Sequence, residues 1–304
     1  MATPDPRSSG DRMWAQESRF SRSAEVTSVE RLTLTGTVRI RARVTDDRPF
    51  SYLPGQFVAI QGDVPGVGLQ HSPYCMFVPA TGDRTFEMLL RVFPEGPLSH
   101  YLASAPPGTP LAFRGPSGRS MLPKEGDTEL VLVATGVGIS PFHALLLDIL
   151  ERGERRPVRL FWGLRLVDDI CLTDELDRLA RAHPNFSYAV SLSQPPEGWA
   201  GLRGRVTESV PRLLERLGGT RFYLAGNGAM AEEMEVALSG MGVDRSLIHE
   251  ERFFNARYDA DPAVIDTILA RFVAHDLFSP HAEQQAPMLF PIEHDVHGRT
   301  YGPG

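Results

Sequence analysis

The hydrophobic pattern of this chain changes character near residue 124, and this change constrains the possible folds more than any other feature. Before it, from Ala24 to about Leu122, apolar residues come in strand-length runs such as QFVAI and TFEMLLRV, and a Pro-Gly pair at 54–55 marks a turn. Helical periodicity is nearly absent from this part. The pattern therefore predicts a small antiparallel β-barrel.

After PKEGDTE the chain alternates between apolar runs and amphipathic segments. The runs LVLVA, VRLFWG, FSYAVSL and RFYLAG predict strands, and helices are predicted over 141–150, over TDELDRLARA, near 207–217 and from Ala229 to about Ser239. Alternation of this kind is typical of a doubly wound parallel sheet with helices on both faces. We therefore predict an α/β domain after the barrel.

The change of pattern divides the 304 residues into four parts: a mobile polar arm over 1–23, the barrel over 24–124, the α/β domain over 125–255 and an extension over 256–304. The extension includes a predicted helix near 262–277. Its apolar stripe requires burial against the two domains or against a partner.

Composition excludes several classes of function. The formal charge of −7 argues against a nucleic-acid surface. Two cysteines, Cys75 and Cys171, are too few for a four-thiolate cluster or a disulfide framework, so we expect a reducing, cytoplasmic setting. No apolar run is long enough for a membrane span. Histidines in the extension lack metal-ligand spacing, so we predict no metal site.

A glycine turn follows the first strand of the α/β domain. In VATGVGISPF, Gly136 and Gly138 end the strand, Ser140 is in place to cap the next helix, and Pro141 suits its first turn. Free backbone N–H groups at such a turn, together with the helix dipole, make an anion site. An ordinary tight turn is the competing interpretation, because the third glycine of the dinucleotide fingerprint is absent.

Two further strand ends carry groups that suit a nucleotide. A second glycine turn, LAGNGAM, follows the strand at 221–225, and Arg165 comes just after VRLFWG. Because the carboxyl ends of parallel strands share one edge, both turns are predicted to line one crevice. A guanidinium at this edge suits a phosphate or a ribose. A solvated loop arginine is the alternative.

With these motifs the chain resembles the ferredoxin–NADP reductase superfamily over about residues 24–255. Members carry a GTGIAPF turn, a WGxR…D…EL segment, a CGxxxM turn and a terminal IHxExF, which stand here as GVGISPF, FWGLRLVDDICLTDEL, AGNGAM and IHEERF. The resemblance implies NADH or NADPH as co-substrate. The residues that it assigns to nucleotide binding are Thr135, Gly136, Gly138, Ile139, Ser140, Arg165, Gly226, Asn227, Met230 and Phe253.

The same resemblance gives the barrel a bound flavin, FAD rather than FMN. Where the family has R-x-Y-S, this chain has Ser72-Pro73-Tyr74-Cys75, so Tyr74 is in place to stack on the isoalloxazine ring. The arginine that neutralises the flavin phosphates is missing, with His71 and Arg91 as possible substitutes. Cys75 replaces the hydroxyl directed at flavin N5 with a weaker donor.

A second flavin motif, G-x-x-S, is matched by GPLSHYL. Gly96, Leu98 and Ser99 are then assigned to the flavin pyrophosphate, with Ser99 as the cap of a short helix. The GPSG at 115–118 matches the family's GPxG. In the nucleotide domain, Ala225 replaces the family's cysteine, and Glu251 matches its terminal glutamate.

These assignments predict a flavoprotein oxidoreductase that takes a hydride from NAD(P)H, with Tyr74, Cys75 and Glu251 as catalytic residues. Electrons then pass to a separate partner: an iron–sulfur protein, an oxygenase or a haem protein. NADH is predicted over NADPH, because Ser193-Gln194-Pro195-Pro196 offers no cation. The alternative is a non-catalytic subunit of a larger redox complex with a degenerate flavin site. Met230, Met234 and Cys171 are also predicted to be buried core residues.

Overall fold

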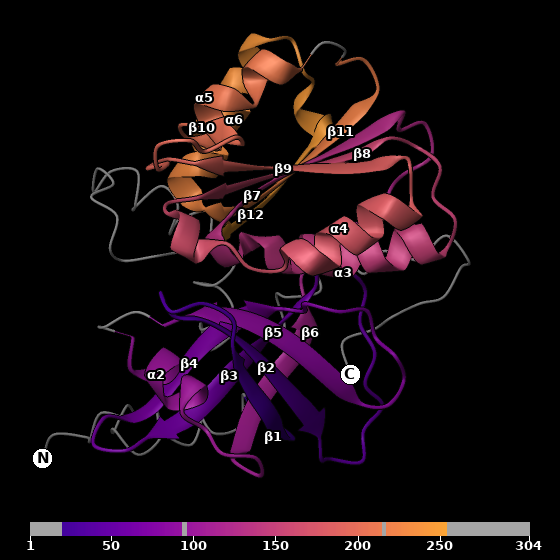
Figure 1. The fold of residues 1–304 in the computed structure, drawn as a ribbon. Helices are drawn as coiled ribbons and strands as arrows, with labels where there is room; N and C mark the ends of the chain where they lie inside the picture. Colours follow the sequence, from indigo (N-terminus) through magenta and orange to yellow (C-terminus); the bar gives the residue numbers. More distant parts are fainter. Residues whose placement is uncertain (1–19, 93–95, 215–216, 254–304) are drawn as a thin grey trace, which may run out of the picture.

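A computed structural model describes residues 20–92, 96–214 and 217–253, which form two stacked units (Figure 1). Most of the predicted arm, the C-terminal extension with its predicted helix, and the histidines of that extension lie outside the described residues. The barrel occupies the lower half of Figure 1 and the α/β unit the upper half.

The N-terminal unit is a curled antiparallel sheet. Its strand order is β4-β3-β6-β1-β2-β5, and a bridge between Met76 and Met88 links its two edges. The predicted barrel is therefore confirmed. The strands are β1 (Arg22–Arg31), β2 (Thr37–Val44), β3 (Phe57–Val64), β4 (Gly68–Cys75), β5 (Thr85–Arg91) and β6 (Pro110–Ser117), and a short helix, α2 (Pro97–Ala103), precedes β6.

The barrel closes because its strands bury alternate residues. In β2, Val38, Ile40 and Ala42 are buried while the arginines between them face outward. A strand with this period has one apolar face, which the barrel turns inward. The aromatic rings of Phe50, Phe86 and Phe113 meet in the interior, with centroids 5.6–5.7 Å apart.

Strand β1 begins at Arg22, two residues before the predicted start of the barrel at residue 24. Arg22 is only 2% exposed, and its Nη2 lies 3.1 Å from Asp46 Oδ1. The guanidinium also lies over the rings of Phe50 and Phe113, at 5.2 and 5.1 Å from their centroids. Arg22 is therefore a buried residue within a segment of polar sequence. The local sequence does not predict its burial, because its partners are distant along the chain.

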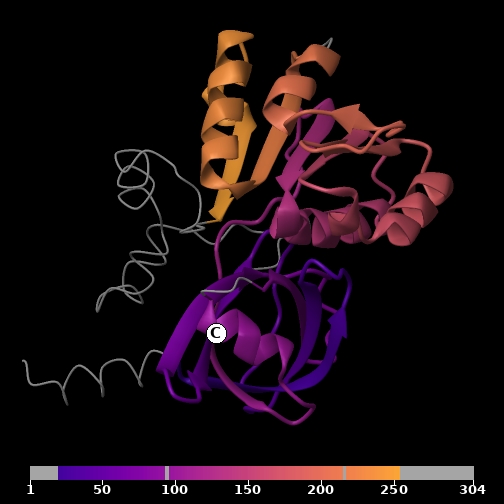
Figure 2. The ribbon, with the colours of Figure 1, turned by 60° about the vertical axis from the view of Figure 1, so that its left-hand side comes forward.

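The second unit is a parallel sheet of order β10-β9-β8-β7-β11-β12. Its strands are β7 (Glu129–Thr135), β8 (Val158–Leu164), β9 (Phe186–Leu192), β10 (Leu202–Arg203), β11 (Thr220–Asn227) and β12 (Ile248–Phe253). Helices α3 (Ile139–Glu151) and α4 (Thr173–Ala182) cover the face toward the barrel, and α5 (Val206–Ser209) and α6 (Gly228–Gly240) cover the other face (Figures 1 and 2). The predicted doubly wound sheet is confirmed.

One predicted helix is wrong in extent. Instead of a single helix near 207–217, the chain forms α5 and then a 3-10 turn over Pro211–Leu213. Pro211 has no N–H to continue the α-helical hydrogen bonds, which accounts for the break. The apolar side chains Val206, Val210 and Leu214 are nevertheless buried against the sheet.

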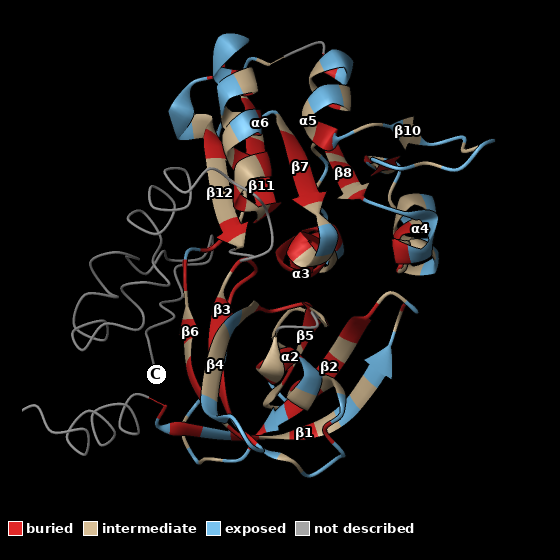
Figure 3. Cartoon of the chain, turned by 90° about the vertical axis from the view of Figure 1, so that its left-hand side faces the viewer, coloured by how far each residue is buried: buried red, intermediate tan, exposed pale blue. Residues whose placement is uncertain are grey.

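Helix α3 lies between the parallel sheet and the barrel (Figure 3). Its His143 stacks on Phe77 of the barrel, with ring centroids 4.0 Å apart, and His143 Nδ1 lies 2.9 Å from the Phe77 carbonyl oxygen. Beside this contact, Arg39 Nη2 lies 2.7 Å from Glu175 Oε1. Phe77 also belongs to the hydrophobic core of the α/β unit, so the two units share packed side chains.

Within the described residues, no helix has the length and apolarity needed to cross a membrane. The same part of the chain contains no cluster of three or more His, Cys, Asp or Glu side chains arranged for a metal ion.

Candidate flavin and nucleotide site

The two glycine turns of the α/β unit touch each other. They follow β7 and β11, which are neighbours in the sheet. A Cβ on Gly138 would lie 2.7 Å from the Cα of Gly226, and a Cβ on Gly226 would lie 3.0 Å from the backbone N of Thr135. Gly226 also has a φ of +127°, which favours glycine. Both glycines are therefore required by close backbone packing.

This packing gives the reason for Gly138. Its Cβ position faces the backbone of Ala225 and Gly226, so a side chain there would collide with the second turn. Gly136, with a φ of +54°, has nothing within 4 Å of its Cβ position and is the more open of the two. Its carbonyl oxygen accepts a hydrogen bond from Trp162 Nε1 at 2.8 Å, which fixes the turn.

The predicted cap at Ser140 is wrong. Residues 136–138 form a 3-10 turn that runs directly into α3, so the helix begins at Ile139 and Ser140 lies inside it. The Ser140 hydroxyl donates to the Val137 carbonyl at 2.8 Å instead of accepting from the helix. Ile139 and Ser140 are both buried. The backbone amides that open the 3-10 turn, rather than the serine side chain, remain as the anion donors, because the N–H of Ile139 already donates to the carbonyls of Gly136 and Val137.

Asn227 has a structural role at the second turn. Its Oδ1 accepts hydrogen bonds from the backbone N of Ala229 at 2.8 Å and of Met230 at 3.4 Å, so it caps α6. Its own backbone N donates to Thr135 Oγ1 at 3.0 Å. Met230 and Met234, both residues of α6, are buried in the core between this helix and the sheet, as predicted. The Asn227 side chain therefore holds the turn in shape.

Arg165 is exposed just past the end of β8, and its Nε lies 3.3 Å from Gln194 Oε1. Backbone hydrogen bonds also join the two strand ends, from Gln194 N to Arg165 O and from Ser193 N to Leu164 O. The segment after β9, which has no cation of its own, thus has a guanidinium beside it.

On the barrel side, Tyr74 and Ser72 lie on the same face of β4. Tyr74 is opposite Val58 of β3 and Ser72 is opposite Ile60, whereas His71 is opposite Gln61. Directly opposed residues share a face and successive residues alternate, so His71 lies on the other face. Its ring contacts Phe20, with centroids 5.5 Å apart. His71 therefore does not replace the missing arginine on the Tyr74 face.

Arg91, the other proposed substitute, is engaged elsewhere. Its Nη1 lies 2.9 Å from Asp169 Oδ1 and 3.0 Å from Thr35 Oγ1, and the ion pair joins the barrel to the α/β unit. Burial works against the charge of Asp169, but the hydrogen bonds from Thr35 and Arg91 outweigh it and lower the pKa of this carboxyl. We therefore assign Arg91 to this contact instead of a flavin phosphate.

Cys75, Phe57 and Phe253 form a small apolar cluster where the end of β4 meets the end of β12. Cys75 is buried, and burial raises the pKa of its thiol well above the usual value, with the charge of Glu251 adding to the rise. Burial raises the pKa of Glu251 to about 8, although the charge of Arg119 opposes this. The fold thus brings together three of the predicted site residues, Cys75 from the barrel and Glu251 and Phe253 from the α/β unit.

The short helix α2 begins after Gly96, with Pro97 in its first turn. Ser99 does not cap it, because the serine lies in the first turn and its hydroxyl donates to the Gly96 carbonyl at 2.7 Å. Leu98 and Ser99 are buried. A Cβ on Gly62 of β3 would lie 2.9–3.1 Å from atoms of Leu98 and Tyr101, so this glycine lets α2 lie directly on the barrel.

These residues fit a flavin ring better than its phosphates. The half-buried Tyr74 ring, with a side-chain hydrogen bond to Ser72, offers a stacking plane one residue before Cys75 in the chain. For the phosphates, the Tyr74 face lacks the family's arginine, and the first-turn amides of α2 remain as donors. The chain is therefore suited to FAD with weaker phosphate contacts.

Sequence reasoning missed the residues that hold the two units together. Asp169 and Glu175 lie in VDDICLTDEL, where the sequence pattern predicts a loop carboxylate and a carboxylate in the first turn of a helix. His143 is predicted only as a residue of the helix before them. In the fold, hydrogen bonds from His143 and Arg39 hold the pKa of Glu175 at about 2. The only local signal was a cluster of acidic residues, because their basic partners are 32 positions away for His143, 78 for Arg91 and 136 for Arg39.

Comparisons with known proteins agree with this geometry. Residues 25–121 match the family described as an oxidoreductase FAD-binding domain, and residues 132–235 match the oxidoreductase NAD-binding domain. The reductase component of the naphthalene 1,2-dioxygenase/salicylate 5-hydroxylase systems of Ralstonia sp. is 29% identical, over 70% of this chain and 64% of that protein. Ferredoxin–NADP reductase B of Sorangium cellulosum is also 29% identical, over 68% of this chain and 88% of that protein.

Two solved structures share the fold. The Amycolatopsis cytochrome P450 reductase GcoB superposes with a TM-score of 0.69 at 26% identity, covering 77% of this chain and 70% of that one. The ferredoxin reductase in carbazole 1,9a-dioxygenase gives a TM-score of 0.67 at 28% identity, covering 77% and 69%. With both oxidoreductase domains in order and the two turns, the tyrosine strand and the terminal glutamate in place, the chain belongs to the ferredoxin–NADP reductase superfamily.

Proposed function

We propose that this chain is an NAD(P)H-dependent flavoprotein oxidoreductase that delivers electrons to a separate acceptor protein. The observation that carries the proposal is the meeting of Cys75 from the barrel with Glu251 and Phe253 from the last strand of the α/β unit. Tyr74 lies next to Cys75 on β4. A flavin ring stacked on Tyr74 and a nicotinamide approaching from the α/β unit would then meet at this junction.

When bound, FAD supplies the capacity to accept a hydride and to release electrons one at a time. The protein contributes position and electrostatics. The Tyr74 ring provides a stacking plane, and a side-chain hydrogen bond with Ser72 fixes its hydroxyl. The Glu251 carboxyl, with its pKa near 8, holds its proton at neutral pH and is able to donate a hydrogen bond there. Phe253 and Phe57 exclude water from the Cys75 thiol.

For the nucleotide, we propose that the pyrophosphate lies over the turn at 136–140. The support is backbone geometry: β7 ends at Thr135, and the 3-10 turn at 136–138 that follows it opens the helical segment, so its leading backbone amides lie at the start of that segment. Arg165, beside Gln194, is positioned at the neighbouring strand end for the ribose or its phosphate. Thr135 and Gly226 act by shaping the turn.

The acceptor is proposed from chemistry and from relatives. Two cysteines do not hold a four-thiolate cluster, so the electrons leave this chain. Related proteins are named as reductase or electron transfer components of dioxygenase and monooxygenase systems. We propose an oxygenase, an iron–sulfur protein or a haem protein as partner. Both cysteines are free thiols, which supports a cytoplasmic setting.

The alternative is a non-catalytic subunit with a degenerate flavin site. It is favoured by the missing arginine at Ser72 and by the engagement of Arg91 with Asp169. Titration of FAD into the purified full chain separates the two proposals. The oxidoreductase proposal expects saturable quenching of flavin fluorescence at one FAD per chain, followed by anaerobic bleaching of the visible flavin absorbance with NADH.

Two variants sharpen this titration. Tyr74→Phe keeps the stacking ring and should bind FAD as the original chain does, whereas Tyr74→Ala should weaken binding about tenfold or more, since stacking on an aromatic ring contributes about 1–3 kcal/mol. Unchanged flavin fluorescence at saturating FAD would favour the non-catalytic subunit.

A further inference from the structure

A basic pocket of about 220 Å³ lies where the linker between the two units meets β11 and β12. Among the described residues that line it, none is a carboxylate and five are arginine, lysine or histidine. The lining residues are Arg119, Ser120, Leu122, Lys124, Arg221, Tyr223, Arg245, Ser246, Ile248 and His249.

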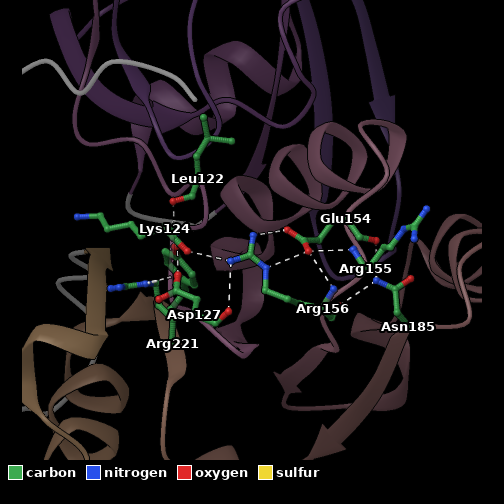
Figure 4. Close-up of polar contacts among 9 residues, drawn as sticks. Leu122, Lys124, Asp127, Glu154, Arg155, Arg156, Asn185 and Arg221 are labelled. Atoms are coloured by element: carbon green, nitrogen blue, oxygen red, sulfur yellow. Dashed lines mark hydrogen bonds and ion pairs between the residues drawn. The ribbon is translucent and has the colours of Figure 1, made fainter. Parts of the chain in front are cut away.

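The pocket is separate from the proposed nucleotide turns. Arg221 is the second residue of β11, and the strand ends six residues later at Asn227. With about 3.3 Å per residue in a parallel strand, the two ends are about 20 Å apart. Figure 4 shows Lys124 and Arg221 close to Leu122 of the linker, with Asp127 between the two basic residues. Of the residues that line this pocket, Arg119 bears on the proposed flavin site through its charge, which opposes the rise in the pKa of Glu251.

Nearby carboxylates balance only part of the positive charge. Arg221 Nε lies 2.7 Å from Asp127 Oδ2, and Arg245 pairs with Glu235 and, at 3.0 Å, with Glu250. Arg119 is exposed, and among the described residues it makes no ion pair. Arg119 therefore brings to the pocket a positive charge that no ion pair among the described residues neutralises.

His249 adds an unpaired polar atom. Its Nε2 is shielded from solvent and has no hydrogen-bond partner among the described residues, while its ring lies 5.5 Å from that of Tyr223. Burial lowers the pKa of His249 to about 4, and the charges of Arg119, Lys124, Arg221 and Arg245 lower it further in the same direction. A neutral imidazole thus faces a cationic pocket with one nitrogen unsatisfied, which is unfavourable unless a ligand pairs with it.

We propose that this pocket binds a phosphate group, either as free inorganic phosphate or as the end of a phosphomonoester. The volume holds a small oxyanion with a few waters, at about 30 Å³ per water, and is below the range of about 300–1,000 Å³ typical of drug-sized ligands. Arginine and lysine are the side chains that bind phosphate oxygens. The Ser120 hydroxyl accepts from Leu122 N at 3.1 Å and keeps its own proton to donate.

Phosphate fits the unpaired nitrogen better than a carboxylate does. A neutral imidazole carries its proton on one nitrogen only, so Nε2 is either a donor or an acceptor. Monohydrogen phosphate has both an O–H and bare oxygens, so it satisfies Nε2 in either state. A carboxylate only accepts, and it pairs with one tautomer alone.

The test is calorimetric titration of the full chain at constant ionic strength, without flavin or nicotinamide. Inorganic phosphate and phosphoserine are the two phosphate probes, and malonate is the carboxylate control. We expect saturable binding of at least one phosphate probe at one site per chain. Binding of phosphoserine in addition to inorganic phosphate identifies an accessible pocket that takes phosphomonoesters, and binding of inorganic phosphate alone identifies the free ion as ligand.

Arg119→Gln should weaken phosphate binding about tenfold or more, because a charge-assisted contact is lost. Arg119 is exposed, so this variant keeps the fold, which its melting temperature verifies. Arg212→Gln, at an exposed arginine of the 3-10 turn, is the matched control and should bind phosphate as the original chain does. Absence of binding, equal binding by Arg119→Gln, or equal affinity for malonate overturns the proposal. FAD binding is scored separately, so failure of one proposal leaves the other standing.

Discussion

The Cα of Gly226 lies only 2.7 Å from the position that a Cβ on Gly138 would occupy. The two residues belong to different strand-end turns, 88 positions apart in the chain, and neither turn keeps its place if the other moves. Gly138 itself has a φ of −60°, which any residue adopts. The glycine is therefore required by its neighbour across the sheet and not by its own backbone conformation.

Gly138→Ala should lower the free energy of unfolding by about 1–3 kcal/mol, because the new methyl group is forced against backbone atoms that cannot rotate away. Gly240→Ala is the matched control: this glycine ends α6 with nothing within 4 Å of its Cβ position. Its stability should stay the same or rise by up to about 1 kcal/mol. Urea unfolding of both variants makes the measurement, and equal stabilities would show that the two turns are not in contact.

The ion pair between Arg91 and Asp169 should couple the two units. A double-mutant cycle with Arg91→Met and Asp169→Asn is expected to give a coupling of about 1.5–3 kcal/mol, since the bonds are charge-assisted and Asp169 is buried. The pair of Arg43 and Glu25 is more exposed and lies within the barrel, so its cycle should give about 0.2–1 kcal/mol. Indistinguishable couplings would contradict the proposed role of Arg91 between the units.

Glu251 should make stability depend on pH between about 4.5 and 8. Burial raises the pKa of this carboxyl in the folded chain to about 8, from the usual 4.5, so the folded state binds the extra proton. The stabilisation is present below pH 4.5 and is lost as the pH rises through 8. We expect the melting temperature of the original chain to fall over this range and that of Glu251→Gln to fall less. Glu125→Gln, at an exposed glutamate, should follow the original chain. Parallel plots of melting temperature against pH for all three proteins would show that the pKa of Glu251 is not raised in the folded chain.

Cys75→Ser tests whether the thiol faces the flavin. If it does, serine restores a stronger hydrogen-bond donor, so nucleotide binding should barely change and flavin reduction by NADH should hold or accelerate. If Cys75 is only part of the cluster with Phe57 and Phe253, serine buries an unpaired hydroxyl and costs about 1–3 kcal/mol. Rapid-mixing flavin reduction and a thermal melt of the same variant distinguish the two. We expect the kinetic gain, and unchanged reduction with a lower melting temperature would exclude Cys75 from the site.

Nucleotide choice should depend on Arg165. We expect NADH to be used more efficiently than NADPH, because residues 193–196 contain no cation, but the guanidinium beside Gln194 should preserve some use of NADPH. Arg165→Gln should lower kcat/KM for NADPH by about tenfold or more, from the loss of a charge-assisted contact, and that for NADH much less. Arg212→Gln is the control. A clear preference of the original chain for NADPH would reverse this prediction.

The fold class followed from the sequence because burial imposes a period on it. In β2 every second residue is apolar, and the helix at 139–151 buries Phe142, Leu145, Leu146 and Ile149 together. Such local patterns depend on neighbours a few positions apart, so they predicted the barrel and the doubly wound sheet. The prediction of one helix near 207–217 was wrong because Pro211 interrupts it. The predictions that Ser140 and Ser99 cap their helices were wrong because both helices begin earlier than the serines.

The sequence by itself determined the two kinds of fold, their order, and the turns and tyrosine strand that mark a flavin and nucleotide protein. Only the tertiary structure decided which groups meet: Gly138 against Gly226, Arg91 with Asp169, and Cys75 with Glu251. These partners are 78 to 176 positions apart, and no local pattern links them. The physical reason is that period and propensity act along the chain, whereas close packing and charge pairing act through space, between segments that folding alone brings together.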